Sequence, residues 1–169
     1  MCSMVRHLSM RLGMHMFTNR LALAAMMLWI VTVSVFAWFF VRGNTTAGTD
    51  GRTAVVLAPA ERDLVLGEMR GLLSASQQVV QGIRQGDMKL VARSARAAGM
   101  ASAADVNPAL MAKLPVAFKS LGMSVHHDMD DLAQAAEEGK SQADLLGMLS
   151  DTMSKCVGCH SAWQLKPAQ

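Results

Sequence analysis

The 169-residue sequence lacks several features that mark common functional classes. It contains no glycine-rich phosphate loop and no internal repeat, so nucleotide binding of that kind and a repeat array are not expected. From Gly43 onward, 12 Lys and Arg residues stand against 13 Asp and Glu residues, which leaves this part near a charge of −1. Nucleic-acid binding requires a clustered positive surface, so nucleic acid is not an expected partner.

Charge is also missing from a long apolar run near the N-terminus, Leu21 to Val41, which spans 21 residues. A helix needs about 20 residues at 1.5 Å each to cross a bilayer. Arginines are more frequent before the run than after it, which places residues 1–20 in the cytoplasm and the rest in the periplasm. A cleaved signal peptide is the alternative, but its apolar core usually has about 7–15 residues. The aromatic residues Trp38 to Phe40 beside Arg42 favour a retained transmembrane anchor over 21–41.

The remainder of the chain divides into a polar segment and a helical domain. Residues 42–58 contain Gly, Thr and Asn without a period, and we predict a flexible tether there. Over 59–169 apolar residues recur at threes and fours, and no strand-like alternation is present. The expected helices cover about 60–85, 88–98, 115–139 and 141–165. Short connections favour antiparallel neighbours, so the predicted fold is all-α: an antiparallel four-helix bundle preceded by one N-terminal transmembrane helix.

Cysteine is scarce, with three residues in the chain, and two of them stand together near the C-terminus. Cys156-Val157-Gly158-Cys159-His160 fits the C-x-x-C-H pattern of haem attachment. On a helix, Cys156 and Cys159 share a face, so both thiols can reach the two vinyl groups of one porphyrin. His160 lies one turn above Cys156, where its imidazole can bind the iron of the same ring. The expected cofactor is therefore one covalent haem c.

Other uses of a cysteine pair are a structural disulfide, a redox dithiol and half of a zinc site. Zinc needs two more Cys or His ligands, and the domain offers only His126 and His127. A thioredoxin-like dithiol usually lies in a βαβ unit, which the helical pattern does not supply. Haem attachment is the interpretation that the motif favours most.

A helical bundle with this motif in its last helix resembles the class II cytochromes c, which include cytochrome c prime and its methionine-ligated, low-spin relatives. The resemblance covers about Pro59 to Leu165, and only the terminal motif is specific. The resemblance implies a left-handed four-helix bundle with haem between the helices. Such bundles are often dimeric, so a second copy of the chain is among the partners that the resemblance allows. The stretch Ser161 to Gln164 lacks the basic residue often found there in relatives.

Members of the resembled family differ at the sixth position of the iron. In cytochrome c prime it is empty and binds small gases, whereas in the low-spin relatives a Met from the first helix fills it. Antiparallel register places Met69 at the level of His160, and we predict Met69 as the sixth ligand, although Met on an apolar stripe is commonly core. His126 is the alternative ligand. Arg70 is expected beside a haem propionate, because Arg binds carboxylates in a fork, with a solvated charge as the alternative.

The predicted function is electron transfer by a membrane-anchored cytochrome, and not catalysis. A haem with two axial ligands keeps its coordination in both oxidation states, and the anchor holds it near redox partner proteins of a respiratory chain. A five-coordinate gas-binding or sensing protein of the cytochrome c prime type is the alternative. A peroxidase is less favoured, because no clear distal acid–base pair is present.

Overall fold

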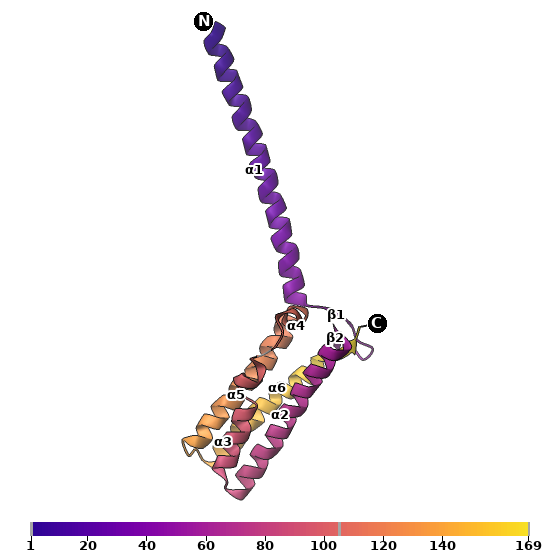
Figure 1. The fold of residues 1–169 in the computed structure, drawn as a ribbon, viewed down its shortest axis with the longest axis vertical. Helices are drawn as coiled ribbons and strands as arrows, with labels where there is room; N and C mark the ends of the chain where they lie inside the picture. The colour runs from indigo at the N-terminus through magenta and orange to yellow at the C-terminus, as the bar shows by residue number, and fades with distance from the viewer. Residues whose placement is uncertain (1, 105, 169) are drawn as a thin grey trace. The chain divides into compact units, whose positions relative to one another are not determined.

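A computed structural model describes residues 2–104 and 106–168, with side chains from Arg20 onward. The chain divides into two units, Met1–Phe39 and Phe40–Gln169. It is mostly helical, with a small three-stranded sheet in the second unit (Figure 1).

Helix α1 (Cys2–Arg42) contains the long apolar run. Its stretch Arg20–Arg42, 23 residues, is long and apolar enough to cross a membrane, and its side chains are exposed. A signal sequence meets the same criterion of length and composition. The expectation of one N-terminal apolar helix is therefore confirmed, while its retention stays a prediction.

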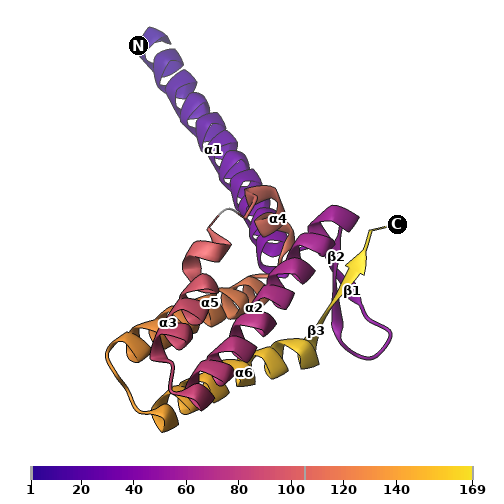
Figure 2. The same ribbon diagram turned by 60° about the horizontal axis from the view of Figure 1, so that its bottom comes forward.

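Four helices of the second unit match the four that the apolar period predicts. They are α2 (Pro59–Gln85), α3 (Met88–Ala97), α5 (Val116–Glu137) and α6 (Gln142–Ala162). Two short helices, the 3₁₀ helix η1 (Met100–Ala103) and α4 (Pro108–Lys113), lie in the connection between α3 and α5. Helices α2 and α5 each contact both α3 and α6, and Figures 1 and 2 show the four long helices side by side.

Local sequence explains where these helices begin and end. Gly86, in the left-handed region at φ 72°, ends α2. The Asp87 side chain then accepts a hydrogen bond from the backbone N–H of Leu90 at 2.9 Å and caps α3. Ser141 caps α6 in the same way through the N–H of Asp144. Each cap satisfies a backbone N–H that the helix itself leaves unpaired.

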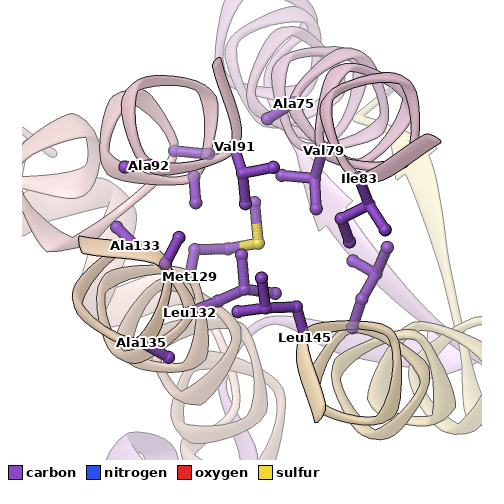
Figure 3. Packing of buried hydrophobic residues seen from close by; sticks show 14 residues of the cluster. Ala75, Val79, Ile83, Val91, Ala92, Met129, Leu132, Ala133, Ala135 and Leu145 are labelled. Atoms are coloured by element: carbon purple, nitrogen blue, oxygen red, sulfur yellow. The ribbon is translucent and has the colours of Figure 1, made fainter. Parts of the chain in front are cut away.

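The main hydrophobic core is shared by all four long helices. Figure 3 shows Met129 of α5 reaching toward Val79 of α2 and Val91 of α3, with Leu145 of α6 nearby. All four side chains are fully buried. These positions belong to the stripes that the sequence predicts, so burial of one apolar face holds each helix in place.

Three strands correct the all-α prediction. They are β1 (Thr45–Ala47), β2 (Thr53–Leu57) and β3 (Trp163–Pro167), in the order β1-β2-β3. Strand β1 pairs antiparallel with β2, which pairs parallel with β3. The flexible tether predicted for 42–58 is therefore wrong over β1 and β2, and the last helix ends at Ala162 and not near Leu165. The sheet lies where α2 begins and α6 ends (Figure 2).

Burial and backbone hydrogen bonds explain why the segment before α2 is ordered. Val55 and Leu57 are fully buried and form a second apolar cluster with Leu110, Leu114 and Phe118. The segment is also tied to the end of α4, because the N–H of Asn44 donates to the carbonyl of Lys113 at 2.7 Å. The second cluster therefore supports the end of the unit that carries the sheet.

Candidate functional site

A groove lies between α2, α5 and α6 and has a volume of about 470 Å³. Protein sites for small molecules and cofactors usually have volumes of about 300–1,000 Å³. Most of its lining is apolar: Val65, Leu66, Met69, Leu72, Leu73, Phe118, Leu121, Val125 and Met153. The same groove is lined by Met69, Arg70, Cys156, Cys159 and His160, so the structure brings together all five predicted site residues.

The two thiols come from the last turns of α6. Both Cys156 and Cys159 are free thiols. Cys159 packs against the second apolar cluster, while the Cys156 thiol donates to the carbonyl of Thr152 at 3.6 Å. Burial raises the pKa of both thiols, and Cys156 adds to the increase at Cys159. A redox dithiol needs a thiol whose pKa is lowered. The environment here has the opposite effect, because it raises the pKa of both thiols.

His160 is exposed near the end of α6 and lines the groove. Its imidazole makes no hydrogen bond to any residue that the structure describes, so both ring nitrogens are available. Among the described residues, no group of three or more His, Cys, Asp or Glu side chains could hold a metal ion. The imidazole of the motif is therefore open to a ligand that binds in the groove.

Met69 lies on α2, across the groove from the motif. Its side chain is partly buried and packs against the second apolar cluster, as Cys159 does from α6. A common cluster places Met69 and Cys159 at the same end of the groove, which agrees with the level that antiparallel register predicts. The thioether of Met69 is therefore in reach of the groove from the side opposite to α6.

His126 lies on α5 and is only 7% exposed. Its Nδ1 lies 2.8 Å from the carbonyl oxygen of Ala98, and since a carbonyl only accepts, Nδ1 carries the proton. In the neutral ring Nε2 then has a free lone pair. Asp128, two positions later on α5, forms an ion pair with Lys155 at 2.6 Å.

The charged groups at the groove are Glu68, Arg70 and Lys155. Arg70 is exposed and has no ion pair among the described residues, so its guanidinium is available at the rim. Lys155 immediately precedes Cys156, and sequence reasoning did not single it out. Its place four residues before Cys159 is the signal that could have identified it, because residues four apart on a helix share a face.

Comparison of the chain with protein-family models, with curated proteins and with solved structures gives no match. The assignment of a function therefore depends on the groove and on the motif that lines it.

Proposed function

We propose that the chain is a membrane-anchored c-type cytochrome that carries one covalent haem c in the groove and transfers electrons on the outer face of the cytoplasmic membrane. One observation carries the proposal: Cys156, Cys159 and His160 face an apolar groove that also contains Met69. The groove has the size and lining of a cofactor site, and the two cysteines are unpaired thiols on one helix face.

Cys156 and Cys159 would hold the haem by adding their S–H groups across its two vinyl groups, which gives two thioether bonds. Their raised pKa keeps both thiols protonated before attachment. His160 would bind the iron from one side through its unengaged imidazole. The bound haem supplies an iron that gains and loses one electron. The apolar lining from α2 and α5 keeps water from the ring, which favours a high reduction potential.

Met69 is the proposed sixth ligand. It approaches from α2, opposite the helix that carries His160, and a thioether is a soft ligand that iron accepts in cytochromes. A second axial ligand leaves no open position for gases, so electron transfer follows in preference to gas binding. We propose no catalytic role for the chain.

At the rim, Arg70 is the proposed partner of a haem propionate. Its exposure and lack of an ion pair among the described residues leave its fork of donors free for a carboxylate. Lys155 is less available, because Asp128 holds it at 2.6 Å. Arg70 is therefore the proposed propionate-binding residue, whereas Lys155 of α6 forms an ion pair with Asp128 of α5.

The wider arrangement also belongs to the proposal. Helices α2, α3, α5 and α6 would form the four-helix bundle of a class II cytochrome c, with the haem between α2, α5 and α6. The apolar stretch Arg20–Arg42 would remain as a single-pass anchor, with the haem unit in the periplasm. Anchoring raises the effective concentration of membrane-bound redox partners of a respiratory chain. A homodimer is compatible with this arrangement.

The test is covalent attachment, measured by mass spectrometry after acid–acetone extraction of protein made in a host that attaches haem. The unmodified chain should keep the haem. A Cys156→Ser/Cys159→Ser double variant should lose it, whereas Cys2→Ser, which removes the third cysteine, should keep it. An unmodified chain that releases all its haem to the solvent would contradict the proposal.

A further inference from the structure

The C-terminal end of α6 needs hydrogen-bond donors. The helix ends at Ala162, two positions after His160, and the last four carbonyls of a helix have no partner within it. The N–H of Trp163 satisfies the carbonyl of Cys159. The carbonyl of His160 lies beyond that bond and needs a donor from another part of the chain.

Arg52 supplies this donor. Its Nη1 lies 3.1 Å from the carbonyl oxygen of His160 and 3.4 Å from that of Trp163. The two residues Arg52 and His160 are 108 positions apart in the sequence. A cation at the end of a helix also offsets the negative end of the helix dipole. The guanidinium therefore binds the backbone of the residue that would ligate the iron.

Asp50 fixes the position of this guanidinium. Its Oδ2 accepts from Nε of Arg52 at 2.8 Å and from Nη2 at 2.6 Å, and its Oδ1 accepts from Nε2 of Gln164 at 3.1 Å. The hydrogen bond to Asp50 raises the pKa of Arg52 and lowers that of Asp50, so both remain charged at neutral pH. Asp50 thus connects Arg52 to the strand that follows the motif.

Strand register explains why Arg52 reaches this place. Thr53 of β2 pairs with Trp163 of β3 in a parallel ladder, so Arg52 stands just before the first pair and beside the last turn of α6. The turn before it is tight. A Cβ on Gly48 would collide with the carbonyl oxygen of Arg52, and only glycine fits there.

We propose that Arg52 is a positioning residue of the haem site, which fixes the backbone of His160 and places a permanent positive charge on its side of the iron. The inference rests on the proposed function. The stretch Ser161 to Gln164 supplies no cation after the motif, and Arg52 provides one from 108 positions before His160 in the sequence. A nearby positive charge favours the reduced iron, because reduction lowers the positive charge of the centre.

The experiment compares the reduction potentials of full-length, haem-loaded variants in membranes. Arg52→Gln should shift the ratio of reduced to oxidised protein about three- to tenfold toward oxidised, which is about 30–60 mV for one electron. Arg52→Lys should recover most of the shift, because it keeps the charge. Lys166→Gln is the matched control: it removes one exposed charge from β3 without touching His160, and should shift the ratio less than about twofold.

Asp50→Asn keeps Arg52 and removes the opposing charge, so it should shift the ratio toward reduced protein. It serves as the second variant if Arg52→Gln does not fold. The inference is overturned if haem-loaded Arg52→Gln keeps the reduction potential of the unmodified protein, or if the reduction potential of Arg52→Lys is as low as that of Arg52→Gln. It is also overturned if Asp50→Asn shifts the ratio of reduced to oxidised protein toward oxidised. Absence of covalent haem from the unmodified chain, read by mass beforehand, is the separate result that refutes the proposed function and the inference with it.

Discussion

Nδ1 of His126 on α5 lies 2.8 Å from the carbonyl oxygen of Ala98, the residue that caps the C-terminal end of α3. One turn later on α5, Asp130 accepts a hydrogen bond from the N–H of Met100 at 2.8 Å. The two side chains hold the turn between α3 and η1 against α5. This turn adjoins the groove, because His126 contacts the turn and also lines the groove.

Replacement of His126 by Phe should lower the free energy of unfolding by about 1–3 kcal/mol, since the buried carbonyl of Ala98 loses its donor. His127→Phe is the control: His127 is exposed, and its replacement should change stability by less than about 0.5 kcal/mol. Chemical denaturation of both variants is the measurement. The haem-loaded His126→Phe protein should keep its low-spin spectrum if Met69 is the ligand, and a change to high-spin would identify His126 as the ligand.

Gly99 lies inside the same turn. A Cβ at this position would collide with the carboxylate of Asp130, whose Oδ2 accepts a hydrogen bond from the N–H of Met100. Gly99→Ala should therefore destabilise the protein by about 1–3 kcal/mol through overpacking. Gly147→Ala is the contrasting variant, because nothing lies within 4 Å of its Cβ in the middle of α6, and it should stabilise by about 0.5–1 kcal/mol. Equal thermal midpoints for the two variants would contradict the close contact between Gly99 and Asp130.

Glu61 at the start of α2 gives the protein a specific acid sensitivity. Its pKa is lowered by the hydrogen bond from Lys113 and further by the N–H of Ala58. A group with a lowered folded pKa contributes stability above its unfolded pKa and loses it as the pH falls through the folded value. Stability should therefore fall on acidification below the ordinary Glu value of 4.5. Denaturation midpoints should fall less in Glu61→Gln, whereas Asp151→Asn, at an exposed site without an ion pair among the described residues, should follow the unmodified protein.

The helices could be predicted from the sequence because their signals are local. The apolar period locates α2, α3, α5 and α6, and glycines and capping residues mark most of their ends. Antiparallel register was enough to place Met69 opposite the motif, since it needs only the helix limits. These are properties of neighbouring residues, which a single sequence displays.

The sheet could not be predicted in the same way. The short strand β2 pairs with β3 more than a hundred positions away, and Trp163 to Leu165 continue the apolar pattern of α6, so the segment looks helical. Arg52 was missed for the same reason, because its partner carbonyl is brought close only by this pairing. The burial of His126 depends on the turn after α3, which the local pattern around His126 does not describe.

The absorption spectrum of the haem-loaded, full-length protein tests the electron-carrier account most directly. The account predicts a low-spin spectrum and no rapid carbon monoxide binding in the unmodified protein. Met69→Ala should become high-spin and bind carbon monoxide readily, whereas Met153→Ala, which changes an exposed Met at the same groove, should stay low-spin. An unmodified protein that is already high-spin and binds carbon monoxide without delay would contradict the account and favour a gas-binding protein.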